Sequence, residues 1–278
     1  MIMKKFILFL LFLLFMSPSF CEVEFEINER GYLSTETLIQ QFGEEILEKN
    51  SLPSKVIFEL SAQNNTINQD MRNIYYENKI EIFSETLDYA QNEEEMKAVL
   101  SHKIAAIADN YSDYKTIQED DDWTFSMDEP NRTYGIGKNY SFERLKAGKK
   151  DFEIDMKGVD LMVCAGINPL SFISVLYQVK MNVVSPTLKE NALNRMVAIH
   201  DYINYNFPSI IEKGYSSDFY EKAFSEINKV ISSRSKEESL KISKKQEKIR
   251  TKKINAAKRA QKYHNSWNTS YCVLKIFK

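Results

Sequence analysis

Apolar residues recur at helical spacing along most of this chain, and strand-like patterns occupy only short segments. Leu38, Phe42 and Ile46 fall on one face of a helix that the spacing predicts over Thr35–Lys49. The same spacing predicts four more helices: Ser84–Asp109 with a break near Gln91–Asn92, Lys150–Ala165, Pro169–Lys180 and Pro186–Tyr205. A long polar and basic helical stretch is expected beyond Tyr215.

Three segments are rich in β-branched and aromatic residues and are predicted as strands: Lys55–Leu60, Lys79–Phe83 and Tyr271–Phe277. Between them, Tyr111–Lys149 has no regular period, is partly acidic and contains Pro130, so we expect an irregular insertion there. Helices with a few strands near the front of the chain predict an α+β fold that is mostly helical with a small β-sheet.

The boundary between two of the predicted helices is marked by Gly166, Asn168 and Pro169. Glycine readily adopts the left-handed conformation that ends a helix, whereas asparagine caps a helix N-terminus and proline suits its first turn. We therefore expect one helix to end at Gly166 and the next to start at Pro169.

The net charge of −2 results from two opposed regions. Residues 229–278 hold 15 basic and 3 acidic residues (+12), and the other 228 residues hold 22 basic and 36 acidic residues (−14). A basic helical tail of this kind can bind an anionic membrane or envelope surface, and we do not expect it to bind nucleic acid outside the cytoplasm. It can also remain solvated without a dedicated partner, or fold back onto the acidic body.

Residues 1–21 have the pattern of a signal peptide. Lys4 and Lys5 precede an apolar run of 11 residues, Phe6–Met16, which is too short to span a bilayer as a helix. We expect an exported protein, periplasmic or secreted, that is membrane-anchored if the signal is retained. Such a compartment permits disulfides, but Cys164 lies in a helical pattern and is interpreted as a buried small residue rather than half of a bridge with Cys272.

Four features suggest a known family. The helix Asn92–Asp109 begins N-E-E-E-M and carries the sequence H-K-I-A-A from His102. It resembles the N-E-x-E-L-A-A-V-L-A-H-E-x-x-H helix of HtpX-like and prenyl-endopeptidase-like zinc metallopeptidases, peptidase family M-forty-eight. Three further segments follow in that family's order: Asp151–Gly158, Ala165–Pro169, and Pro186 with Arg195.

The resemblance implies a zincin-type domain whose catalytic residues are changed. His102 keeps the first metal-ligand position, but Lys103 occupies the position of the general base and Ala106 that of the second His ligand. Asp151 replaces the third-ligand Glu, so His102 and Asp151 are the two residues left that could touch a metal. A hydrolytic zinc site needs three protein ligands and a base, so we expect neither catalysis nor a cofactor. Zinc is expected only if the ligand set has been rebuilt.

The same resemblance places Asp155 where it would support a ligand His. We predict that His102 still donates a hydrogen bond to Asp155, and that Lys103 or Arg195 neutralises some of the carboxylates in place of zinc. Unrelated surface carboxylates on two packed helices are the alternative. Gly158 is expected to let the two helices approach closely.

These observations predict a signal peptide (1–21), an N-terminal helical segment (22–52), a metallopeptidase-like domain (53–215) and a basic helical extension (216–278). The expected function is that of an exported pseudopeptidase, a binding or scaffold module that takes a protein or peptide in the remnant groove. The alternatives are a zinc endopeptidase with a rebuilt ligand set and an envelope-associating protein that works through its basic tail.

Overall fold

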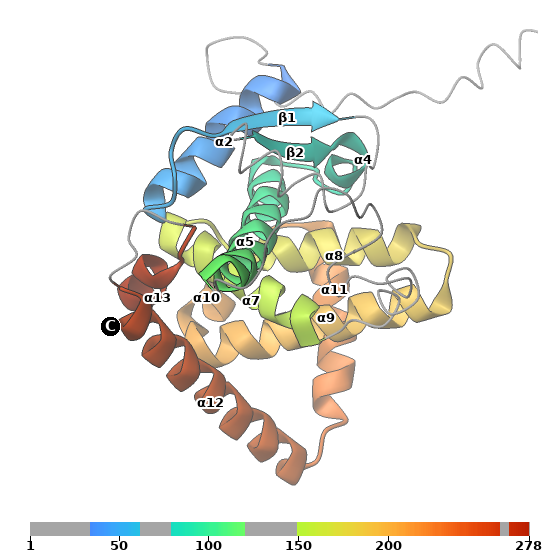
Figure 1. Ribbon diagram of the computed structural model, residues 1–278. Coiled ribbons are helices and arrows are strands. Elements are labelled where there is room, and N and C mark those ends of the chain that lie inside the picture. Colours follow the sequence, from blue (N-terminus) through green and yellow to red (C-terminus); the bar gives the residue numbers. More distant parts are fainter. Residues whose placement is uncertain (1–33, 62–78, 120–148, 262–266, 278) are drawn as a thin grey trace, which may run out of the picture. The chain divides into compact units, whose positions relative to one another are not determined.

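The computed structural model describes residues 34–61, 79–119, 149–261 and 267–277 (Figure 1). The predicted signal peptide and most of the predicted insertion lie outside these residues. None of the helices described here is long and apolar enough to cross a membrane. The elements, in chain order, are α2 (Thr35–Lys49), β1 (Ile57–Ser61), β2 (Lys79–Phe83), α4 (Ser84–Leu87), α5 (Glu93–Glu119), α7 (Lys149–Ala165), α8 (Leu170–Asn182), α9 (Pro186–Asn206), α10 (Pro208–Lys213), α11 (Asp218–Ser232), α12 (Lys236–Ala260) and α13 (Ser270–Ile276).

The two predicted front strands form a two-stranded parallel sheet in which Ile57 pairs with Lys79. Helix α2 is fastened to this sheet by Gln40, which donates to the Val56 carbonyl (2.9 Å) and accepts from the Phe58 amide (2.8 Å). Gly43 lies under the Phe58 ring, and a Cβ there would overlap the ring. The absence of a side chain at Gly43 therefore allows the helix and strand to pack closely.

Helices α5, α7, α8 and α9 pack against one another and contain the main hydrophobic core. The apolar face predicted for α5 is buried, as shown by Leu100 and Ile104, and it meets the buried face of α7 that carries Leu161. Gly166 has a positive φ of 81°, and the Asn168 side chain accepts a hydrogen bond from the Leu170 amide (3.1 Å) at the start of α8. The predicted helix boundary and the mostly helical α+β class are thus confirmed.

Two predicted segments differ from the structure. Tyr271–Phe277 was predicted as a strand, but residues 270–276 form helix α13. Packing of this segment on α7 and α12 buries Cys272, Val273 and Phe277, and this tertiary contact outweighs the β-propensity of the residues. The segment from Tyr111, predicted as irregular, begins as a continuation of α5 up to Glu119, because neither proline nor glycine interrupts that stretch.

The basic tail, residues 229–278, contains the end of α11 and the helices α12 and α13, and α11 meets α12 at a sharp bend (Figure 1). Helix α12 starts with a capping box, in which Ser235 accepts from the Glu238 amide and the Glu238 carboxylate accepts from the Ser235 amide. Its second half contacts the body, because Ala257 is buried and Lys253 pairs with Asp160. Of the possibilities left open by the sequence, folding back onto the acidic body is the one the structure supports for this half.

His200 on α9 is buried against Phe224 of α11, with ring centroids 5.7 Å apart, and neither ring nitrogen has a hydrogen-bond partner among the described residues. Burial lowers the pKa of His200, while the Asp201 carboxylate opposes this shift and Arg234 reinforces it. The unfolded chain, with an imidazole pKa of about 6.5, then binds the proton more readily than the folded protein.

We therefore expect the free energy of unfolding to fall as the pH drops below about 6.5, by up to about 1 kcal/mol per pH unit from this residue. Urea unfolding measured between about pH 8 and pH 5 checks this. His200→Leu removes the titrating group, so its profile should be flatter. If the free energy of unfolding depended on pH in the same way in both proteins, His200 would not be the titrating group.

Candidate functional site

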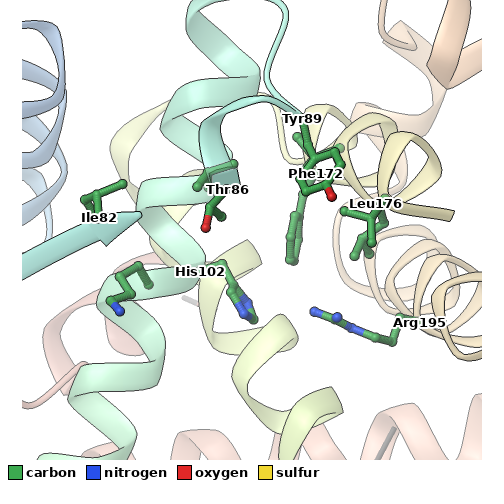
Figure 2. A pocket seen from close by; sticks show the side chains of 11 residues that line it. Ile82, Thr86, Tyr89, His102, Phe172, Leu176 and Arg195 are labelled. Atoms are coloured by element: carbon green, nitrogen blue, oxygen red, sulfur yellow. The ribbon is translucent and has the colours of Figure 1, made fainter. Parts of the chain in front are cut away.

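A cavity of about 210 Å³ opens between β2, α4, α5, α8 and α9 (Figure 2). Most of its wall is apolar. His102 and Arg195 point toward one another across it, and Lys103 also contributes to the lining. The lining residues are Ile82, Thr86, Tyr89, Val99, His102, Lys103, Phe172, Val175, Leu176, Val179 and Arg195.

A buried carboxylate lies behind this polar side of the cavity. Asp155 on α7 is fully buried and accepts two hydrogen bonds from Arg195 of α9, Nε to Oδ2 at 2.7 Å and Nη2 to Oδ1 at 2.6 Å. His102 Nδ1 of α5 lies 3.2 Å from Asp155 Oδ1, at an angle that falls short of a hydrogen bond. The three side chains thus connect α5, α7 and α9.

The electrostatics of Asp155 follow from this arrangement. Burial by itself would raise the pKa of the carboxyl group, but the charge and hydrogen bonds of Arg195, aided by His102, outweigh burial and lower the pKa to about 2. Asp155 is therefore ionised throughout the neutral range. The predicted neutralisation by Arg195 is observed. The prediction for His102 is met in part, because its ring contacts Asp155 at 3.2 Å without the geometry of a hydrogen bond.

Gly158 explains how α5 and α7 come this close. A Cβ at Gly158 would lie 3.4 Å from the His102 Cα and 3.7 Å from the Ser101 carbonyl oxygen, so the α7 backbone passes directly against α5. Since Gly158 lies one turn beyond Asp155, the glycine places the carboxylate next to the His102 ring. The close approach expected at Gly158 is confirmed.

Two other predicted site residues, Ala106 and Asp151, contribute no observed contact to the site. Ala106 lies one turn beyond His102 on α5 and carries no ligand atom. Asp151 lies in the first turn of α7, and its side chain lies outside the described part of the structure. Within the described part of the chain, no three His, Cys, Asp or Glu side chains are grouped as a metal site would require.

The residues present do not fit a catalytic zinc. Arg195 occupies both oxygens of Asp155, and a guanidinium at this position repels a divalent cation. On α5, His102 is followed by Lys103, which cannot act as a base while it is protonated, and Ala106 has no ligand atom in its side chain. We therefore derive no chemistry through a metal.

A second buried carboxylate, Glu95, was not predicted. It is fully buried in the first turn of α5. Among the described residues, all the groups that donate hydrogen bonds to its carboxylate oxygens are neutral. The donors are the Gln91 amide (2.9 Å), Ser174 (2.7 Å), Gln178 (3.0 Å) and Ser217 (3.4 Å). This network joins α5 to α8 and to the start of α11. Nothing in the local pattern of α5 distinguishes Glu95 from the exposed Glu93 and the half-buried Glu94.

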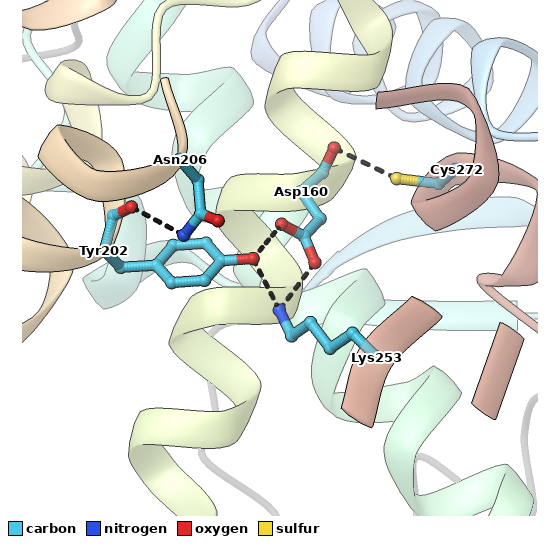
Figure 3. Close-up of polar contacts among 5 residues, drawn as sticks. All are labelled: Asp160, Tyr202, Asn206, Lys253 and Cys272. Carbon is cyan, nitrogen blue, oxygen red and sulfur yellow. Dashed lines mark hydrogen bonds and ion pairs between the residues drawn. The ribbon is translucent and has the colours of Figure 1, made fainter. Parts of the chain in front are cut away.

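A third cluster joins the body to the basic tail (Figure 3). Asp160 of α7 is 1% exposed and accepts from Tyr202 (2.6 Å) and from Lys253 of α12 (2.6 Å). Burial raises the pKa of Asp160 even though Lys253 and Tyr202 act to lower it. In the sequence, this cluster could have been recognised from Asp160, because it is a carboxylate inside the otherwise apolar segment Val159–Ala165.

No family model, curated protein or solved structure matches this chain.

Proposed function

We propose that the protein is a non-catalytic binding module whose cavity holds an apolar side chain of an extended protein or peptide segment. The observation that carries the proposal is the shape and lining of the cavity: a volume of about 210 Å³, an apolar wall and a polar side formed by His102, Lys103 and Arg195. Ligand sites commonly combine such a wall with a few polar groups. The resemblance to M-forty-eight metallopeptidases supports a peptide as the occupant.

The chemistry of the polar side favours binding over hydrolysis. A peptidase needs a group that takes a proton from the attacking water, and Lys103 cannot do so while it is protonated. The Asp155 carboxylate is held by Arg195 and is unavailable as a base. His102, 34% exposed, remains able to contact a ligand at the edge of the cavity.

The proposal is tested with fluorescently labelled peptides from a casein digest, together with zinc analysis of the purified full chain. Val179 lines the cavity, and Val179→Trp fills it; we expect peptide affinity to fall about tenfold or more, as expected when an apolar anchor is excluded. The matched control is Val184→Trp, at a position that is 91% exposed near the same helix, and it should leave affinity unchanged.

The proposal would be contradicted if Val179→Trp and Val184→Trp lost peptide affinity equally, or if the wild-type protein bound no peptide. About one tightly bound zinc per chain together with casein hydrolysis would replace it with the alternative of a rebuilt zinc endopeptidase.

A further inference from the structure

Two cysteines that are far apart in the sequence lie beside each other where α13 packs on α7 (Figure 3 shows Cys272 beside Asp160). The Cys272 thiol donates to the Asp160 carbonyl at 3.1 Å, and Lys275 Nζ donates to the Cys164 carbonyl at 3.2 Å. Asp160 and Cys164 are one turn apart on α7, so the two hydrogen bonds hold α13 along the turn that carries Cys164.

The Cys272 sulfur thus lies against the carbonyl one turn before Cys164 on α7, while the Cys164 thiol donates to the Lys49 carbonyl at 3.5 Å. Both side chains are buried, and both are free thiols in this structure. The interaction with Cys272, followed by the charge of Lys275, lowers the pKa of the Cys164 thiol against the effect of burial, whereas burial raises the pKa of Cys272. Cys164 is therefore the better nucleophile of the pair.

We propose that Cys164 and Cys272 form a disulfide that covalently fastens α13 to α7. The oxidant is a low-molecular-weight disulfide such as oxidised glutathione. The Cys164 thiolate attacks one sulfur of the oxidant, breaks its S–S bond and releases one thiolate. Cys272 then loses its proton and attacks Cys164 in the mixed disulfide, releasing the second thiolate. The protein dithiol loses two electrons and two protons, and the oxidant becomes two thiols.

Burial determines when this reaction takes place. With Cys272 fully buried in the packed structure, the oxidant reaches the thiols before α13 has docked, as the chain folds or when α13 detaches. Once formed, the bridge closes a loop between residues 164 and 272 that contains α8 to α12. The basic helix α12, which packs on α13, is then held to the body. This inference does not depend on the proposed cavity function.

The test refolds the full chain in a mixture of reduced and oxidised glutathione and compares it with the reduced protein. We expect an intact mass lower by about 2 Da, and a Tm higher by about 10 °C, the shift that chain-entropy and size scaling give for a loop of about 100 residues. A non-reducing peptide map should contain one cross-linked species that joins the Cys164 and Cys272 peptides.

Two variants serve as controls. Cys21→Ser removes the third cysteine of the chain and should leave mass change, peptide map and Tm shift intact, whereas Cys272→Ser should abolish all three. The proposal is overturned if the oxidised Cys21→Ser protein still titrates as two free thiols under denaturing conditions. It is equally overturned if the bridge joins Cys21, links two chains, or lowers the Tm.

Discussion

Replacing Arg195 with methionine is expected to destabilise the protein by about 3–5 kcal/mol, the cost of removing one partner of a buried ion pair. Asp155 is fully buried, and Arg195 supplies two short hydrogen bonds and the nearest full positive charge. Without the guanidinium, the contact with His102 at 3.2 Å is the one that the described residues leave to the carboxylate. It must then remain as a nearly uncompensated buried charge or take up a proton, and both cost stability at neutral pH. Urea unfolding at pH 7 measures the effect.

The pH dependence distinguishes this mechanism from a simple loss of packing. The folded pKa of Asp155 is about 2 and its ordinary value is 3.8. Its contribution to stability, about 2 kcal/mol, is therefore present above about pH 4 and lost as the pH falls toward 2. In Arg195→Met this loss of stability on acidification should disappear, because the pKa of Asp155 in the folded protein no longer lies below its value in the unfolded chain.

Two further variants complete the test. Asn194→Ala changes the exposed neighbour of Arg195 and should alter stability by no more than about 0.5 kcal/mol. Adding Asp155→Asn to Arg195→Met removes the buried charge and should restore part of the lost stability. A loss in Arg195→Met below about 1 kcal/mol, or a double variant no more stable than that single variant, would show that the pair does not connect α7 and α9 as described.

Replacing Lys253 with methionine is expected to cost about 3–5 kcal/mol at neutral pH, for a related reason. Asp160 is 1% exposed, and Lys253 is its cationic partner at 2.6 Å; Tyr202 remains as a neutral donor after the change. Because burial already raises the pKa of Asp160, removal of Lys253 should raise it further. The folded variant would then bind a proton more readily than the unfolded chain, so the loss of stability should shrink as the pH falls.

Lys252 provides a matched control, because it is the preceding residue on the same helix and its side chain is exposed. Lys252→Met removes the same charge from the basic tail and should change stability by no more than about 0.5 kcal/mol. Trp267 is buried just before α13, and in a Trp123→Phe background its fluorescence reports whether the tail has detached. Equal stabilities of the two lysine variants would mean that net charge, and not the Asp160 contact, holds the tail.

Much of the local structure follows from the sequence. Gly166, Asn168 and Pro169 mark the boundary between α7 and α8, because the left-handed glycine and the helix cap are local conformational preferences. The front strands were likewise predicted within about two residues, the usual uncertainty of element ends. Tyr271–Phe277 was predicted wrongly because its β-branched and aromatic residues pack as a helix on α7, a contact that local propensity does not contain.

For the candidate site, the sequence allowed His102, Asp155 and Arg195 to be predicted as neighbours through the family resemblance, but not the cavity that they border. Its apolar wall comes from Phe172, Leu176 and other residues on α8, which read from the sequence as ordinary core positions. Whether an apolar residue fills a core or lines a cavity depends on how much space the neighbouring elements leave, and no periodicity encodes that space.

The sequence by itself determined the helical periods of the body, the boundary between α7 and α8, and the separation of an acidic body from a basic tail, because these depend on neighbouring residues or on counting charges. The tertiary structure alone decided which charges are buried together. Lys253 and Asp160 are 93 residues apart, and Lys253 resembles the other lysines of α12 until the helix is placed against α7. The reason is physical: the strength of an ion pair depends on the distance between its charges and on their exclusion from water, and both are properties of the packed molecule.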